Sequence, residues 1–199
     1  MKMKTMKLSV LAFAALTIGI ISCEKDKDKT PVDTKVTVID SISAPFSATK
    51  PYTFFSFKDS AVIANSDSAT TKWDFGVRYV SIIVNSHASG PGNAGVILQP
   101  GIYDNFTSAP ESGYAYDTTA SQPAINTGLH TGWYHYDPAD PTHTFYPISG
   151  QFFVFKTADN HYAKMEILSV GYADFVGQTP ETLIYKFRYT YQADGSRNF

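Results

Sequence analysis

The sequence predicts an all-β protein of mostly antiparallel strands, in one domain that forms a sandwich or an incomplete barrel with long irregular loops. Three observations favour this fold class. Several segments alternate apolar and polar residues with the period of two that is typical of half-buried strands. Aromatic residues, which are enriched in strands, make up 15% of the chain. After the N-terminal segment, no stretch shows the apolar periodicity of an amphipathic helix.

The first 22 residues have the features of a secretory signal peptide. Three lysines precede an apolar run of 14 residues, 8–21, and the small residue Ser22 precedes Cys23. This is the order of a charged region, an apolar region and a cleavage site. The run is shorter than the roughly 20 residues that a spanning helix needs. We therefore expect residues 1–22 to be removed on export.

Cys23 is the expected lipid anchor. The sequence Ile20, Ile21, Ser22, Cys23 resembles a bacterial lipobox, in which the cysteine is acylated and becomes the first residue. The alternative is an ordinary signal peptide that contains a cysteine. Because Cys23 is the only cysteine in the chain, an internal disulfide is impossible. Lipidation explains why the chain has a single cysteine, and buried acyl chains would hold the protein to the membrane without a spanning segment.

Residues 23–35 are expected to form a flexible tether. Lysines alternate with acidic residues from Glu24 to Lys29, and this run has no apolar side chain to bury. It resembles the charged segment of surface-exported lipoproteins, and the alternative is a plain linker. Lys25 stands where an aspartate would favour retention at the inner membrane. We therefore expect the outer membrane, at the cell surface, as the location.

Residues 36–199 are long enough for one domain with a sizeable core. The formal net charge of the whole chain is −2, and no basic stripe is present. Nucleic acid is therefore an unexpected partner.

The first half of this domain contains three predicted strands, at 36–39, 52–57 and 72–84. The third has the clearest alternation, with Trp73, Phe75, Val77 and Tyr79 on one face. From Ser81 onward the alternation is lost, which indicates a bend or burial on both faces. Residues 85–95 contain three glycines and a proline and are expected to form a loop. This loop lacks the Lys-Ser/Thr ending of a phosphate-binding loop.

The second half contains a predicted hairpin and a last strand. Residues 151–157 and 161–168 flank the turn-forming triplet Ala158, Asp159 and Asn160. In the second of these strands, His161, Ala163, Met165 and Ile167 share the expected core face. The last strand is predicted at 183–191, where aromatic residues alternate with polar ones.

The middle of the chain, 101–147, is the segment where we expect a functional site. It has little periodicity, many aromatic residues and three of the five histidines. Long irregular segments inside a compact domain are often functional. No nucleophile elbow, His-Glu-x-x-His motif or P-loop occurs, and no carboxylate pair is singled out by its spacing. We therefore expect a binding protein rather than an enzyme.

His130, His135 and His143 lie within 14 residues of one another, among aromatic residues. Imidazole is a metal ligand, and haem needs apolar walls and one or two axial ligands. The simpler interpretation is that these are solvent-facing loop histidines. The residue pattern by itself favours this simpler interpretation.

Several segments of the chain resemble the HmuY family of haem-binding surface lipoproteins. The matching stretches keep their order along the domain: 72–78 (KWDFGVR), the loop 85–95, 109–114 (APESGY), 132–134 (GWY), 142–143, 147–150 (PISG), 156–159 (KTAD), 162–168 (YAKMEIL) and 191–199 (YQADGSRNF). The resemblance implies an all-β fold, a haem cleft near one edge of it, and delivery of haem to an outer-membrane transporter.

In that family two side chains hold the haem iron, histidines in some members and methionines in others. The resemblance makes His143 the expected axial ligand, with His130 or His135 as its partner and Met165 as an alternative that fits the core better. The expected pocket walls are Trp133, Tyr134, Tyr136 and Tyr146, and Arg78 or Tyr103 is expected to meet a haem propionate. The alternative function is a non-enzymatic lipoprotein of the same fold that recognises a glycan or a protein.

Overall fold

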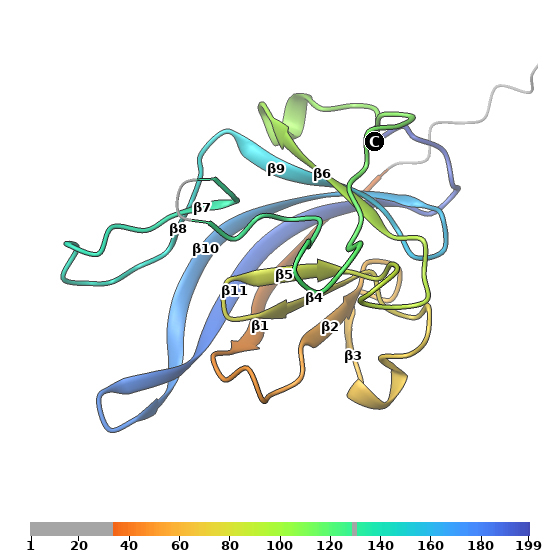
Figure 1. Ribbon diagram of the computed structural model, residues 1–199. Helices are drawn as coiled ribbons and strands as arrows, with labels where there is room; N and C mark the ends of the chain where they lie inside the picture. Colours follow the sequence, from red (N-terminus) through yellow and green to blue (C-terminus); the bar gives the residue numbers. More distant parts are fainter. Residues whose placement is uncertain (1–33, 129–130) are drawn as a thin grey trace, which may run out of the picture. The chain divides into compact units, whose positions relative to one another are not determined.

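A computed structural model describes residues 34–128 and 131–199 (Figure 1). The predicted signal peptide, Cys23, most of the tether and His130 lie outside the described residues. In the described residues the chain is built from antiparallel strands and two short 3-10 turns, η1 (Asn65–Asp67) and η2 (Tyr103–Asn105). The predicted all-β fold class is therefore confirmed.

The largest sheet has the strand order β1-β11-β10-β9-β6 within the described part of the chain. Its strands are β1 (Val36–Pro45), β6 (Gly95–Pro100), β9 (Gln151–Lys156), β10 (Tyr162–Val176) and β11 (Thr179–Gln192). All neighbours in it are antiparallel. β10 and β11 are long, and Figure 1 shows the far end of this hairpin projecting beyond the other strands.

A smaller sheet has the order β3-β2-β4-β5, again counting only the described residues. It comprises β2 (Thr53–Ser56), β3 (Ala61–Ile63), β4 (Phe75–Arg78) and β5 (Ser81–Val84). The short strands β7 (Tyr134–His135) and β8 (Tyr146–Pro147) pair as a separate hairpin.

The small sheet packs face to face on the large one, because each sheet turns a row of aromatic side chains toward the other. The ring centroids of Phe55 and Phe187 lie 5.3 Å apart, and those of Phe57 and Phe155 lie 5.0 Å apart. Both pairs join the two sheets in one buried core. Of the two predicted architectures, the structure is thus the open sandwich.

A second, smaller core covers the other face of the large sheet. Tyr103, Phe152 and Val154 are buried there, together with Ala109, and Phe199 packs against them. The irregular segment that follows β6 supplies this cover. The large sheet is therefore buried on both faces over part of its area. Antiparallel sheets more commonly leave one face in solvent.

The predicted strand 72–84 is in fact a hairpin, so the prediction of one strand is wrong. β4 ends at Arg78 and β5 begins at Ser81, and these two residues are register partners. Tyr79 has φ +50°, which is a turn conformation and not an extended one. The apolar residues alternate as far as Tyr79, which lies in the turn, and the loss of alternation from Ser81 onward coincides with the start of the next strand.

The predicted hairpin of 151–157 and 161–168 is confirmed as β9 and β10. Ala163, Met165 and Ile167 are buried on the expected core face. Lys164 is also buried, on the opposite face, where its Nζ donates to the carbonyls of Tyr103 and Phe106. The cover of this second face comes from a segment far away along the chain.

Candidate functional site

The loop between β7 and β8 carries His143 and is tied together by Asp140. The Asp140 carboxylate accepts the backbone N–H and the hydroxyl of Thr142, each at 2.8 Å. Its other oxygen accepts the Tyr146 hydroxyl at 3.1 Å. The hydrogen bonds from Thr142 lower the pKa of Asp140. His143 donates its N–H to the Asp140 carbonyl at 2.9 Å and adopts φ +50°.

The His143 side chain is exposed, yet both ends of the residue are held. Its ring nitrogen Nδ1 lies 3.0 Å from the Tyr136 hydroxyl, and the two rings stack at an interplanar angle of 25°. Its backbone carbonyl accepts a hydrogen bond from the Tyr172 hydroxyl of β10. The second ring nitrogen, Nε2, has no partner among the described residues. The imidazole thus presents one free nitrogen in a fixed orientation.

A cluster of aromatic rings lies beside this imidazole and contacts it through Tyr136. We call the group Phe46, Tyr79, Tyr136, Phe145 and Tyr172 the aromatic floor. Phe145 stacks on Tyr136, with centroids 4.8 Å apart, and lies 5.5 Å from Tyr79. Phe46 links Tyr79 at 4.8 Å to Tyr172 at 6.1 Å. These rings come from four separate segments of the chain. Together they form a connected aromatic cluster beside His143, in which Phe145 is buried and the other four rings are at least partly exposed.

Burial raises the pKa of Tyr79 and of Tyr172, and in both cases neighbouring tyrosines add to the rise. Both hydroxyls are therefore protonated at neutral pH and can donate hydrogen bonds. The Tyr185 hydroxyl, from β11, donates to the Tyr79 carbonyl at 2.5 Å and anchors the floor to the large sheet.

Trp133 and Tyr134, which the sequence predicted as pocket walls, lie beneath the aromatic floor and do not face solvent. Their exposed fractions are 3% and 4%. The Trp133 indole donates to the Val80 carbonyl at 3.0 Å, and the Tyr134 hydroxyl donates to the Thr127 carbonyl at 2.7 Å. Tyr134 packs on Phe145. They support the site instead of lining it.

His135 leaves β7 on the side opposite to the aromatic floor. Tyr134 and Tyr136, its neighbours in the chain, both contact Phe145. Because successive side chains of a strand point to opposite faces, His135 points the other way. The structure therefore brings together His143 and Tyr136, but not His143 and His135. Tyr146 is exposed and borders the His143 loop.

Met165 is only 1% exposed and belongs to the main core between the sheets. Its thioether packs among apolar side chains, which fits the core position that the sequence favoured for this residue. Tyr103 is equally buried and bonds the Thr190 hydroxyl at 2.8 Å, so it is not placed to meet a propionate. Arg78 turns its guanidinium toward Tyr52, away from the turn that carries Tyr79.

Sequence reasoning missed most of the aromatic floor. Phe46 follows β1, Tyr79 stands in a turn that was predicted as strand, and Tyr172 lies beyond the predicted end of its strand. Nothing in the local pattern around these residues indicates a site. These rings come together at one end of the sandwich only when the two sheets pack on each other.

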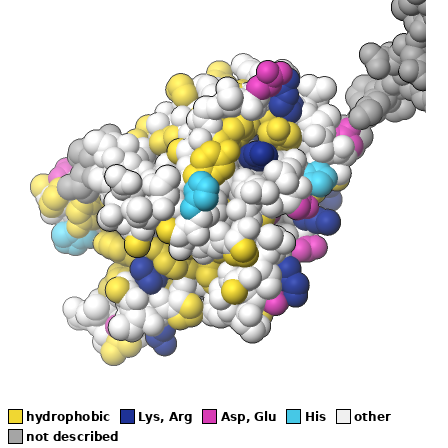
Figure 2. Space-filling view, turned by 45° about the vertical axis from the view of Figure 1, so that its right-hand side comes forward, with side chains coloured by type: hydrophobic (Ala, Val, Ile, Leu, Met, Phe, Trp, Pro, Cys, Tyr) yellow, Lys and Arg dark blue, Asp and Glu magenta, His cyan; other side chains and the backbone are white. Residues whose placement is uncertain are grey.

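The surface has a mixed charge. In the face drawn in Figure 2, acidic and basic side chains are interspersed between hydrophobic ones. Within residues 34–128 and 131–199, no three His, Cys, Asp or Glu side chains gather closely enough to hold a metal ion by themselves. Nor does any helix in the described ranges have the length and apolarity to cross a bilayer.

No family model matches the chain, and no curated protein matches it. Several solved structures are similar, among them the following three. A candidate HmuY-like haem-binding protein from Bacteroides vulgatus is 17% identical, over 78% of this chain and 91% of that one, with TM-score 0.48. The apo HmuY analogue of Tannerella forsythia is 15% identical, over 80% and 99%, with TM-score 0.44. A candidate lipoprotein from Bacteroides fragilis is 11% identical, over 76% and 86%, with TM-score 0.41.

Proposed function

We propose that this protein binds haem on the aromatic floor, with His143 as an axial ligand of the iron. One observation carries the proposal: an exposed imidazole is held in one orientation, with one free nitrogen, beside a surface of aromatic rings. A flat apolar macrocycle with a metal at its centre has this pair of requirements. The sequence resemblance to the HmuY family points to the same ligand.

The hydrogen bond to Tyr136 allows His143 the tautomer that iron needs. If Nδ1 carries the proton and donates it to the Tyr136 oxygen, Nε2 has a free lone pair for the iron. Metal-binding histidines usually donate their other N–H in this way, and the partner fixes the ring orientation. Tyr136 is thus a positioning residue, and the partly exposed rings of Tyr79 and Tyr172 would contact the porphyrin face.

For a second axial ligand, the sequence offered His130 and His135. His135 points away from the floor, so we propose His130, which lies outside the described residues. The protein would bind haem without catalysing a reaction.

The proposed cellular role is that of a haemophore-like lipoprotein. Cys23 would be acylated and hold the domain at the outer membrane, on the cell surface, from which haem passes to an outer-membrane transporter. Cys23→Ala should yield a protein that fractionates away from membranes. Incorporation of labelled palmitate into Cys23→Ala would contradict the anchor.

The haem proposal is tested by titrating the full-length protein with ferric haemin and following the Soret band. We expect saturable binding, and His143→Asn should shift the band and weaken the affinity. Asparagine suits the positive φ of His143 and keeps a polar side chain. His87→Asn is a matched control, because His87 is also exposed, has φ +42° and lies beside a tyrosine ring.

Tyr136→Phe separates positioning from packing, since it keeps the ring and removes only the hydroxyl. Loss of an outer-shell partner of a metal ligand typically costs about 10- to 100-fold in affinity. An unchanged spectrum in His143→Asn would remove this residue from the site. If the native protein shows no saturable change at all, haem binding is wrong, and the alternative of a glycan- or protein-binding lipoprotein takes its place.

A further inference from the structure

A second cavity, distinct from the aromatic floor, lies on the outer face of the small sheet. It has a volume of about 570 Å³, within the range of about 300–1,000 Å³ that is typical of small-molecule sites. β2, β4 and β5 contribute to its lining, and segment 117–127 and Tyr52 complete it. We call it the Arg78 groove.

Arg78 is held in this groove by neutral groups only. Its Nη1 donates to the carbonyls of Ala48 at 3.0 Å and Lys50 at 3.3 Å. Its Nη2 lies 3.4 Å from the Tyr52 hydroxyl, and the guanidinium stacks over the Tyr52 ring at 4.3 Å. No carboxylate among the described residues pairs with it. The guanidinium is thus fixed in place without a carboxylate bonded to it in the described part of the chain.

The other two arginines of the domain differ in this respect. Arg188 bonds the carboxylates of Asp104 and Glu166, and Arg197 bonds that of Glu111. A guanidinium has five N–H donors, of which Arg78 uses three. The Nε–H and one Nη2–H remain. Parallel N–H donors of this kind bind a carboxylate through both of its oxygens.

The edge of β5 adds a backbone donor and a backbone acceptor to the same groove. Asn85 donates to Asp74 across the β4–β5 pair, whereas the N–H of Val84 points outward, to Asp117. Because hydrogen-bonded and non-bonded pairs alternate in antiparallel strands, the N–H and C=O of Ile82 also point outward.

Ile82 lines the groove although its side chain belongs to the core, so its backbone is the part that faces the cavity. Its N–H and C=O have no partner in the described part of the chain. Buried backbone groups are nearly always paired with protein, water or a ligand. Ile82 therefore marks a place for a bound hydroxyl or amide.

Hydroxyl side chains make up much of the remaining wall. Ser81, Ser89, Thr119, Ser121 and Thr127 all line the groove. The one carboxylate in the wall, Asp117, is already occupied, because Val84 and Ala124 donate their N–H groups to its two oxygens at 2.8 and 2.7 Å. Among the described residues, the groove thus combines a guanidinium that has no ion-pair partner with many small hydrogen-bonding groups.

We infer that the Arg78 groove binds a small acidic sugar, with its carboxylate on Arg78 and its hydroxyls on the Ile82 backbone and the serine and threonine side chains. A fixed guanidinium selects a planar carboxylate, and a wall of hydroxyls and backbone groups suits a ring that carries several hydroxyls. This site is separate from the proposed haem surface, because Arg78 and Tyr79 direct their side chains to different parts of the molecule.

The test is an amide NMR titration of the full-length protein with glucuronic acid, with glucose as the neutral analogue and acetate as the bare carboxylate. We expect glucuronic acid to shift the Ile82 amide and the Arg78 Nε–H signals. Charge-assisted bidentate bonds should make its affinity roughly 10- to 100-fold higher than that of glucose. Arg78→Gln should abolish this preference, whereas Arg197→Gln, which removes an equal charge outside the groove, should keep it.

Ser121→Trp provides a second variant that leaves Arg78 in place. Ser121 lies on the exposed side of the groove, so the indole should fill the cavity and remove binding without disturbing the core. Equal binding of glucose and glucuronic acid would overturn the inference, as would equal binding of acetate. Triglycine is included to detect strand pairing with β5. Tighter binding of triglycine than of glucuronic acid would replace the sugar by a peptide.

Discussion

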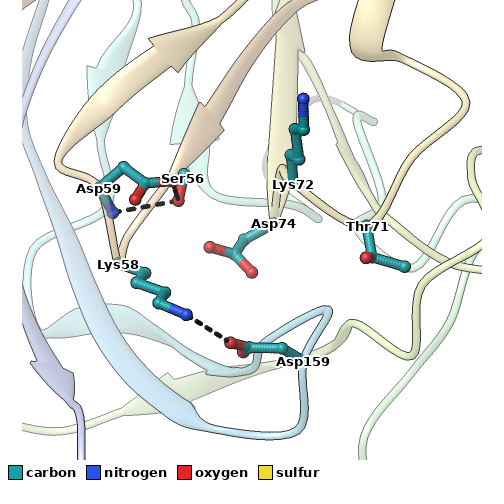
Figure 3. A pocket seen from close by; sticks show the side chains of 7 residues that line it. All are labelled: Ser56, Lys58, Asp59, Thr71, Lys72, Asp74 and Asp159. Carbon is teal, nitrogen blue, oxygen red and sulfur yellow. Dashed lines mark hydrogen bonds and ion pairs between the residues drawn. The ribbon is translucent and has the colours of Figure 1, made fainter.

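Asp74 is the side chain whose burial has the clearest measurable consequence. It belongs to the β4 region of the small sheet and points into a pocket lined by Ser56, Lys58, Asp59 and other polar residues (Figure 3). Only 5% of its surface is exposed. One carboxylate oxygen accepts the Phe57 N–H at 2.8 Å, and the other accepts the Ala158 N–H at 2.9 Å. Asp74 therefore joins the turn after β2 to the turn after β9.

Burial is the largest effect on this carboxyl and raises its pKa from 3.8 to about 6, although the two backbone hydrogen bonds act in the opposite direction. In the unfolded chain the pKa returns to its ordinary value. Between these two pKa values, the folded state binds more protons than the unfolded state. The stability from this group is thus fully present below pH 3.8 and is lost as the pH rises through about 6.

The difference corresponds to about 3 kcal/mol, at about 1.4 kcal/mol for each tenfold change in proton affinity. We expect the free energy of unfolding to fall by this order between pH 4 and pH 7. Urea denaturation at a series of pH values, followed by tryptophan fluorescence, measures it, because Trp73 and Trp133 are both buried. Asp159, whose pKa is lowered, acts in a separate window below pH 3.8.

Asp74→Asn should remove this pH dependence, since the amide does not titrate. Its stability at neutral pH combines two opposing effects: the charge is no longer buried, but one of the two backbone N–H groups loses its acceptor. Asp59→Asn is the matched control, because Asp59 lines the same pocket and is exposed. It should keep most of the slope. A native profile that is flat or rises between pH 4 and pH 6, or an equal slope in Asp74→Asn, would refute the reasoning.

Three further substitutions test the packing. Met165→Ala should cost about 2–5 kcal/mol in urea denaturation, because it opens a cavity in the core; a cost below about 1 kcal/mol would show that Met165 is not packed there. Gly132→Ala should destabilise the fold by more than about 1 kcal/mol, since a Cβ would lie 2.0 Å from the Asn126 carbonyl oxygen, and an unchanged melting temperature would contradict this contact. Tyr103→Phe should cost about 1–3 kcal/mol, because the buried Thr190 hydroxyl loses its partner, while haem affinity stays the same; a weaker haem affinity would return Tyr103 to the haem site.

The regular part of the fold was predictable because burial alternates locally along a strand. Ala163, Met165 and Ile167 have the period of two, and they line the core of β10 as the sequence predicts. The turn before β10 was predictable for the same reason, since Asn160 tolerates the positive φ that the turn requires. The far halves of β10 and β11 were not, because their exposed residues, such as Phe175 and Val176, lack a buried face.

The candidate site was only partly predictable. His143 and Tyr136 lie close together in the sequence, and a short hairpin brings such residues into contact. The sequence could not separate them from Trp133, which is also aromatic and near. The side chains differ in how deeply they are buried, and burial depends on which segment of the chain covers each of them. Tyr185 of β11 covers Trp133, and it lies in a different part of the chain.

The sequence by itself determined the all-β class, the strand hairpin around Asn160 and the segment in which a histidine site was to be sought, because these follow from local periodicity, turn chemistry and composition. Only the tertiary structure decided that Phe46, Tyr79 and Tyr172 meet beside His143, and that Arg78 faces a separate groove. These contacts join residues far apart in the chain. Strand register and the packing of the two sheets determine them, and neither is encoded in the pattern of a single segment.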